Sequence, residues 1–225
     1  MARSVIFTQT PRCARCSFVP RWCICAGFQA IDCPLQIEVL MHRREIHRPT
    51  STGRLINRVM LHSRLHPFAT ETPPNRDAIV APDSTPWILH PRGESMPSTT
   101  PPANLQVILL DGSWREAARM TQTVSTWGRL VRLPMHTPGR YWLRKQQGEE
   151  GYSTAEALLV LLGALGLKAA EAQLRLQFEL HVYAGLRSRG AINLAEDFLA
   201  TSPLPAAMPA LLEQLHQRRP EPRET

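Results

Sequence analysis

The chain has 225 residues, of which 43% are hydrophobic, so it is long and apolar enough to fold around a core, which excludes global disorder. Its formal net charge is +7, and Arg greatly outnumbers Lys. This basic balance favours a polyanionic partner, with nucleic acid first and a membrane surface second. The longest apolar run, residues 157–167, is too short to cross a bilayer, so we expect a core helix there and a cytoplasmic protein.

The first predicted element is a cysteine cluster. Two close pairs of thiols fall within thirteen residues: Cys13 and Cys16, then Cys23 and Cys25. Each pair can wrap one side of a tetrahedral ion, so the spacing predicts a structural zinc site. Disulfides or a redox pair are the alternatives. Residues 1–12 lack the apolar core of a signal peptide, and a reducing compartment disfavours disulfides. Cys33 is left over, and we expect it to be a buried spare thiol.

Strands and helices then alternate along the chain. The predicted strands are short runs of apolar or β-branched residues: 35–41, 78–81, 87–89, 105–110 and 129–133. Three predicted helices begin at side chains that can cap them: Ser51 or Thr52, Ser113 and Ser153. Two further amphipathic helices are expected at residues 169–186 and 208–216. This alternation predicts an α/β domain with a mostly parallel sheet flanked by helices.

The most apolar predicted strand ends at Asp111, next to a turn and a helix start. Open α/β sheets bind ligands beyond the carboxyl ends of their strands. Asp111, the helix-start amides at Ser113 and the ring of Trp114 would therefore face one crevice. The alternative is that Asp111 and Ser113 are ordinary helix-start residues and that Trp114 packs in the core.

Two segments are rich in basic residues. Residues 42–54 hold four arginines, two histidines, a glycine and three hydroxyls, which is typical of a phosphate-binding loop or of a plain solvated surface. His42 and His47 are not spaced like a metal pair, so we expect both at the surface. Residues 140–145 mix aromatic and basic side chains, as RNA-binding surfaces do, although Trp142 could equally pack inside.

These motifs occur in an order that resembles the DTW-domain family, the tRNA-uridine aminocarboxypropyltransferases. The resemblance covers residues 13–183 and rests on the four cysteines, residues 48–56, Leu110-Asp111-Gly112-Ser113-Trp114-x-x-Ala117, and Tyr141-x-Leu143-Arg144 followed by residues 153–157. The chain departs from the family pattern at three positions. Ser113 replaces the Thr of Asp-x-Thr-Trp, Ser51 stands where many relatives have Asn, and Trp142 stands where Arg is frequent.

The resemblance implies a reaction and a fold. The reaction transfers the 3-amino-3-carboxypropyl group of S-adenosylmethionine to N3 of a tRNA uridine and leaves methylthioadenosine. The fold would be SPOUT-like, with a zinc-binding segment at residues 1–33 and a catalytic domain at residues 34–225. The expected partners are tRNA and S-adenosylmethionine, with no membrane and no obligate protein partner.

The resemblance also suggests residue roles. We expect Asp111 to be catalytic, because a carboxylate can accept the N3 proton as the new bond forms. The expected cofactor contacts are Leu110, Gly112, Ser113, Trp114, Arg144, Thr154 and Glu156, although a plain capping box accounts equally well for the last two. The expected phosphate contacts are Arg43, Arg44, Arg54 and Arg58. The alternatives are an RNA methyltransferase that uses the same cofactor, a non-catalytic zinc-knuckle RNA-binding protein and a thiol redox protein.

Overall fold

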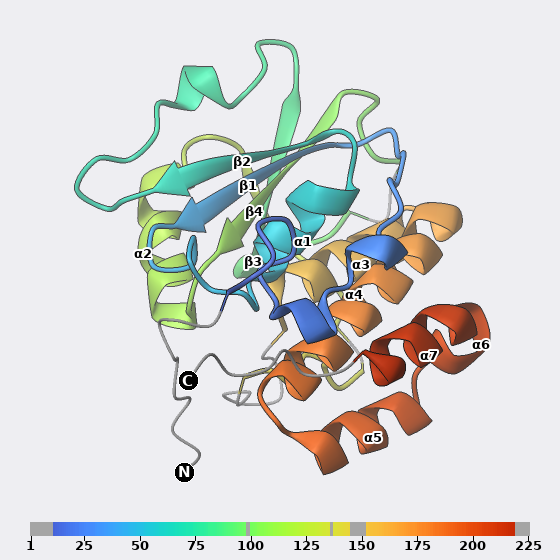
Figure 1. The fold of residues 1–225 in the computed structure, drawn as a ribbon. Helices are drawn as coiled ribbons and strands as arrows, with labels where there is room; N and C mark the ends of the chain where they lie inside the picture. Colours follow the sequence, from blue (N-terminus) through green and yellow to red (C-terminus); the bar gives the residue numbers. More distant parts are fainter. Residues whose placement is uncertain (1–10, 98–99, 136, 145–151, 219–225) are drawn as a thin grey trace.

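A single parallel sheet organises the structure, a computed structural model that describes residues 11–97, 100–135, 137–144 and 152–218 (Figure 1). In this part of the chain the sheet has five strands in the order β2-β1-β4-β3-β5, and every pair is parallel. The strands are β1 (Gln36–His42), β2 (Ser63–Phe68), β3 (Thr85–Ser95), β4 (Leu105–Asp111) and β5 (Arg129–Arg132). The predicted α/β class with a parallel sheet is confirmed.

Helices cover both faces of the sheet (Figure 1). Helix α2 (Trp114–Val124) packs on one face, over a small core that includes Leu40, Ile108 and Met120. The other face carries α1 (Thr52–Val59), α3 (Thr154–Ala164) and α4 (Lys168–Ser188) over a larger core. Three shorter helices follow α4: α5 (Ile192–Ala200), α6 (Leu204–Ala207) and α7 (Pro209–Gln217). None of the described helices has the length and apolar character that a bilayer crossing needs.

The central strands are apolar because both of their faces are covered. Strand β4 is buried at every position except Leu110, and β1 is exposed only at Gln36. The register aligns Leu40 with Leu110 and Met41 with Asp111, so β1 and β4 end at the same edge. Burial on two faces produces the continuous apolar run that predicted β4.

Strand β2 was not predicted, because its sequence is polar. It lies at the edge of the sheet and pairs with β1 only. Pro67 has no N–H group to donate, and an edge strand tolerates this because no strand lies on its other side. Its polar side chains pair with Glu38 of β1, which is 1% exposed. Arg64 Nη2 and His66 Nε2 both lie 2.6 Å from carboxylate oxygens of Glu38, so the buried charge is compensated.

Two other expectations were wrong in detail. Residues 78–81 do not form a strand; Arg76–Ala78 is a short 3-10 turn capped by the side chain of Asn75. Ile79 and Val80 are apolar because they pack in the core beneath α2. Strand β3 is longer than the predicted residues 87–89 and extends from Thr85 to Ser95. Helices α5 and α6 were not predicted.

The cap-based helix predictions are confirmed. Ser51 accepts a hydrogen bond from the Arg54 amide at the start of α1. Capping boxes begin α2, with Ser113 and Glu116, and α3, with Ser153 and Glu156. The amphipathic helix expected at residues 169–186 corresponds to α4, and that at 208–216 corresponds to α7.

The cysteine segment packs against the last helices. It contains two 3-10 turns, Pro20–Trp22 and Cys25–Gly27. The Trp22 ring lies edge-on to Tyr183 of α4 and to His216 of α7, at centroid distances of 6.3 and 6.4 Å. The segment therefore belongs to the larger core, which it shares with α1, α3 and α4. The boundary between residues 33 and 34 stays a prediction.

Candidate active site

A cavity of about 810 Å³ opens at the carboxyl edge of the sheet. Strand ends, the starts of α2 and α3, and the loop before α3 all contribute to its wall. Asp111 lines it together with six of the seven predicted cofactor contacts: Leu110, Gly112, Ser113, Trp114, Arg144 and Thr154. The fold thus brings together residues from two separate motifs, as expected for a ligand site at this edge of a parallel sheet.

Asp111 is buried where two helices begin. Its Oδ2 accepts a hydrogen bond from the Ser51 hydroxyl at 2.8 Å, and its Oδ1 accepts one from the Thr154 hydroxyl at 2.6 Å. Ser51 caps α1, and Thr154 is the first residue of α3. A Cβ atom on Gly53 would lie 2.7 Å from Asp111 Cγ, so the glycine allows this close approach. The hydroxyl group of Ser51 therefore supplies a hydrogen-bond donor to the carboxylate.

Glu45 holds two arginines at the cavity wall. Its side chain is 1% exposed, and its Oε1 accepts a hydrogen bond from Arg48 Nη1 at 2.5 Å. Its Oε2 accepts one from Arg144 Nη2. Both arginines line the cavity. Sequence analysis missed Glu45; the signal available was a single acid among four arginines in residues 42–54.

Tyr141 ties the loop before α3 to the segment before α1. Its phenol donates a hydrogen bond to the Thr50 carbonyl at 2.6 Å. Burial raises the pKa of Tyr141, so the phenol remains a donor at neutral pH. The Arg144 guanidinium lies 5.9 Å from the Tyr141 ring centroid. Trp142 is half-buried and packs edge-on against Phe198 of α5, so it does not line the cavity.

Glu156 is a capping residue. Its carboxylate accepts hydrogen bonds from the backbone amides of Ser153, at 2.7 Å, Tyr141, at 3.1 Å, and Arg140. Burial raises the pKa of Glu156 even though these amides lower it. Glu156 is not among the residues that line the cavity. Glu156 therefore acts as a capping residue. Its hydrogen bonds from the Arg140 and Tyr141 amides also fix the loop that carries Arg144.

His42 was expected at the surface, and this was wrong. Its ring is buried, and Nδ1 lies 3.2 Å from Glu116 Oε1. The second oxygen of Glu116 accepts hydrogen bonds from the Ser113 amide and hydroxyl, each at 2.8 Å. Burial opposes ionisation of Glu116, but the Ser113 donors and the charge of His42 lower its pKa overall. His47 is exposed, as expected.

His90 lines the cavity and was also missed by sequence analysis. It is 8% exposed and lies in the middle of β3, two residues beyond the pairing of Ile88 with Ile108 of β4, where it lines the cavity. Its Nδ1 accepts a hydrogen bond from the Arg92 amide at 3.1 Å, which places the ring proton on Nε2. Burial, with a smaller effect from Arg92, lowers the pKa of His90, so the ring is neutral at pH 7.

The predicted phosphate contacts fall into two groups. Arg43 and Arg44 are exposed beyond the end of β1; Arg43 lies 3.3 Å from Glu71, and Arg44 lies 3.7 Å from Glu116. Arg54 and Arg58 donate inside the chain, to the carbonyls of Ile46 and Arg15, each at 2.8 Å. Burial lowers the pKa of Arg58 to about 10. The latter two guanidinium groups therefore hold loops together.

The four predicted ligand cysteines lie close together. Their sulfur atoms are all within 4.8 Å of one another, with Cys13 and Cys25 at 3.5 Å and Cys16 and Cys23 at 3.7 Å. Zn–S bonds of about 2.3 Å in a tetrahedron place sulfur atoms about 3.8 Å apart, so the four thiols could bind a metal such as zinc. Cys33 is buried outside this group. None of the four cysteines lines the cavity.

Comparison with known proteins identifies the family. No solved structure matches the chain. A family model described as the DTW domain matches residues 10–184, from before the cysteine cluster to a point within α4. The chain therefore belongs to the DTW-domain family, the family of tRNA-uridine aminocarboxypropyltransferases.

Proposed function

We propose that the protein transfers the 3-amino-3-carboxypropyl group of S-adenosylmethionine to N3 of a uridine in tRNA. Family membership is consistent with a tRNA-modifying activity. The observation that carries the finer proposal is the placement of Asp111, buried at the wall of a cavity and held by two hydroxyl donors. The cavity volume of about 810 Å³ falls within the range of about 300–1,000 Å³ that small-molecule sites occupy.

In the proposed reaction a carbon–nitrogen bond replaces a carbon–sulfur bond. Uridine N3 attacks the methylene carbon attached to the sulfonium, and the sulfur leaves with the bonding electrons as the neutral thioether of methylthioadenosine. Asp111 takes the N3 proton as general base. Each of its oxygens accepts one hydroxyl hydrogen bond and keeps acceptor capacity for this proton. Attack at this carbon and not at the methyl group requires that N3 lie about 3–3.5 Å from the methylene carbon, in line with its bond to sulfur.

We assign Arg144 to the carboxylate of the transferred amino-acid group. Its guanidinium is fixed at the cavity wall by Glu45, and one third of the side chain remains exposed. A guanidinium carries five N–H donors, so it can bind a second carboxylate while it keeps Glu45. Thr154 and Ser113 also line the cavity, and we assign their hydroxyl groups to further contacts with the donor.

We propose a structural role for zinc at the four cysteines. The sulfur distances fit one tetrahedral ion, and the cluster lies in a segment that packs against α4 and α7 rather than in the cavity wall. A bound zinc ion would link the two cysteine pairs and hold the segment in place. We also propose a cytoplasmic location, since the thiols need a reducing compartment to remain metal ligands.

Mass spectrometry of the products tests the function. Purified protein is incubated with unmodified tRNA and S-adenosylmethionine, and the nucleosides and the small-molecule product are identified. The proposal expects aminocarboxypropyluridine together with methylthioadenosine. Adenosylhomocysteine and a methylated base would instead identify a methyltransferase, and tRNA binding without turnover would identify a non-catalytic RNA-binding protein.

A further inference from the structure

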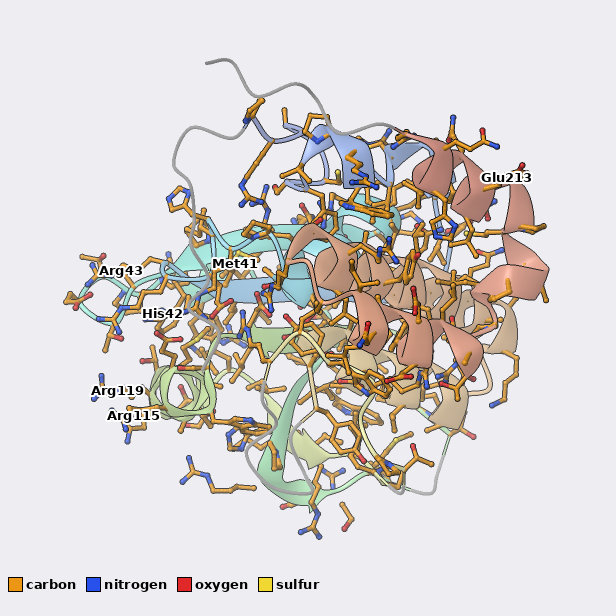
Figure 2. The ribbon with its side chains drawn as sticks, turned by 60° about the horizontal axis from the view of Figure 1, so that its bottom comes forward. Met41, His42, Arg43, Arg115, Arg119 and Glu213 are labelled. Atoms are coloured by element: carbon orange, nitrogen blue, oxygen red, sulfur yellow. The ribbon has the colours of Figure 1, made fainter. Side chains whose placement is uncertain are left out.

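Helix α2 presents arginines at the mouth of the cavity. Its inner face buries Met120 and Val124 against the sheet. Arg115 and Arg119 are exposed on its outer face, four residues apart and therefore on neighbouring turns of one side. In Figure 2 both project from α2 toward the side of the molecule where Arg43 lies, whereas Glu213 of α7 lies on the opposite side. Arg44, Arg115 and Arg119 all line the cavity, and we name this set the arginine rim.

The charge of the arginine rim is weakly compensated. Within the described part of the chain, no acidic side chain forms an ion pair with Arg115 or Arg119. Arg44 lies 3.7 Å from Glu116, a carboxylate already shared with Ser113 and His42. A cluster of weakly compensated guanidinium groups at a cavity mouth raises the local concentration of anions and orients phosphate groups.

Trp114 adds an aromatic surface to the arginine rim. It begins α2, lines the cavity and is 41% exposed. Its exposure is unusual, because three other tryptophans of the chain are buried: Trp22, Trp87 and Trp127. Exposed aromatic rings beside arginines are typical of surfaces that bind single-stranded nucleic acid, because bases stack on the rings while phosphates bind the cations.

The basic residues of the cysteine segment are used differently. The Arg15 and Arg58 guanidinium groups lie 5.5 and 5.3 Å from the Phe28 ring centroid, and Arg21 lies 5.2 Å from the Trp22 centroid. Arg58 also donates to the Arg15 carbonyl. These guanidinium groups therefore contact aromatic rings and a carbonyl group of the protein itself. None of these three arginines lines the cavity, whereas every member of the arginine rim does.

We infer that RNA docks on the arginine rim, with its phosphates on Arg44, Arg115 and Arg119, and that the target uridine enters the cavity past Trp114. The inference rests on the proposed function and adds the docking surface to it. A base enters a protein cavity only from a single-stranded or looped segment, or after it leaves its stack, so the segment that docks is an unpaired part of the RNA.

A matched pair of double variants tests the inference. Arg115→Ala with Arg119→Ala removes two charges from the arginine rim. Arg129→Ala with Arg175→Ala removes two charges from elsewhere: Arg129 begins the edge strand β5 and pairs with Glu94, Arg175 lies on α4 and pairs with Glu171, and neither arginine lines the cavity. Binding of tRNA is measured against salt concentration for both and for the wild type, together with binding of S-adenosylmethionine.

The arginine-rim variant should bind tRNA about tenfold or more weakly at low salt and should bind S-adenosylmethionine as the wild type does. The slope of log K against log salt should fall by about 0.7–0.9 for each lost phosphate contact. The control variant should keep the wild-type slope. Trp114→Ala should lower product formation with little change in slope, and Trp114→Phe should restore it.

Three results separate failure of the inference from failure of the function. If the wild type forms product but the arginine-rim and control variants share its salt slope, RNA docks elsewhere and the inference is wrong. Loss of binding to anionic phospholipid vesicles in the arginine-rim variant, with tRNA binding unchanged, would also overturn it. If the wild type neither binds nor modifies tRNA, the proposed function itself fails.

Discussion

Two buried carboxylates have different surroundings: Asp111 lines the cavity, and Glu45 lies behind two arginines that line it. Asp111 receives hydrogen bonds only from hydroxyl groups among the described residues, whereas Glu45 is held by two guanidinium groups. Of the two, Asp111 alone lines the cavity, where a bound uridine could contact it. Asp111 is therefore the better candidate for the base, and Glu45 is a positioning residue for Arg144.

Asp111→Asn should abolish product formation while binding of S-adenosylmethionine stays within about threefold of the wild type. The amide keeps the shape of the side chain but cannot accept the N3 proton. Ser51→Ala is the control, since it removes one hydrogen bond to Asp111 and leaves the carboxylate; it should keep measurable activity and cost about 1–2 kcal/mol of stability. Full activity of the Asn variant would remove Asp111 as the base.

Glu45→Gln should weaken binding of S-adenosylmethionine, because Arg144 loses the charge that fixes it. We expect the free energy of unfolding to fall by about 2 kcal/mol, less than the full cost of breaking a buried ion pair, because Arg48 and Arg144 both reach solvent. Urea denaturation and titration calorimetry measure the two effects. Glu71→Gln breaks only the exposed pair with Arg43 and should change neither by a measurable amount.

At the scale of elements, the sequence predicts the parts whose signals are local. The starts of α1, α2 and α3 follow from capping residues, and β4 follows from its apolar run. Strand β2 is polar because its partner is the buried Glu38, a contact across the sheet that no local pattern encodes. The same distinction holds for the site residues. Asp111 could be predicted because it directly follows a predicted strand. Glu45 and His90 could not be predicted, because they meet the other site residues only in the folded chain.

The start of α1 approaches Asp111 so closely that Gly53 is required. Gly53→Ala would place a Cβ atom 2.7 Å from Asp111 Cγ, so we expect activity to fall at least tenfold, even though Ala is the better helix former by about 1 kcal/mol. Gly163→Ala in α3 is the control: its Cβ would meet only the flexible end of Glu171, at 3.0 Å. That variant should remain active and be as stable as the wild type or slightly more so. Equal activities of the two variants would contradict the account of α1.

At the scale of the whole molecule, segments far apart in sequence share one core with the cavity. The family match ends within α4. Helix α5, which lies beyond the match, contacts the loop before α3 that carries Arg140 and Arg144. Arg140 forms an ion pair with Glu179 of α4 and lies 4.5 Å from the Phe198 ring centroid of α5. Gln177 of α4 donates to the Gly27 carbonyl at 2.8 Å, next to the cysteine cluster. Helix α4 therefore connects the candidate metal site with the loop that carries Arg144.

This connection predicts that loss of metal lowers stability before it alters the chemistry. Cys23→Ser should lower zinc content and the melting temperature, because the cysteine segment would lose its link while α4 and the cavity remain. Elemental analysis and thermal denaturation measure both. Cys33→Ala removes a buried thiol outside the cluster and should keep the full metal content. A zinc-loaded, fully stable Cys23→Ser variant without activity would contradict a structural role.

The most direct test of the central claim follows the label from S-adenosylmethionine into tRNA. Two preparations of the donor are compared, one labelled in the aminocarboxypropyl group and the other in the methyl group, with wild-type protein and with Asp111→Asn. The account predicts that only the aminocarboxypropyl label enters tRNA, and only with the wild type. Entry of the methyl label, or transfer at the wild-type rate by the Asn variant, would contradict it.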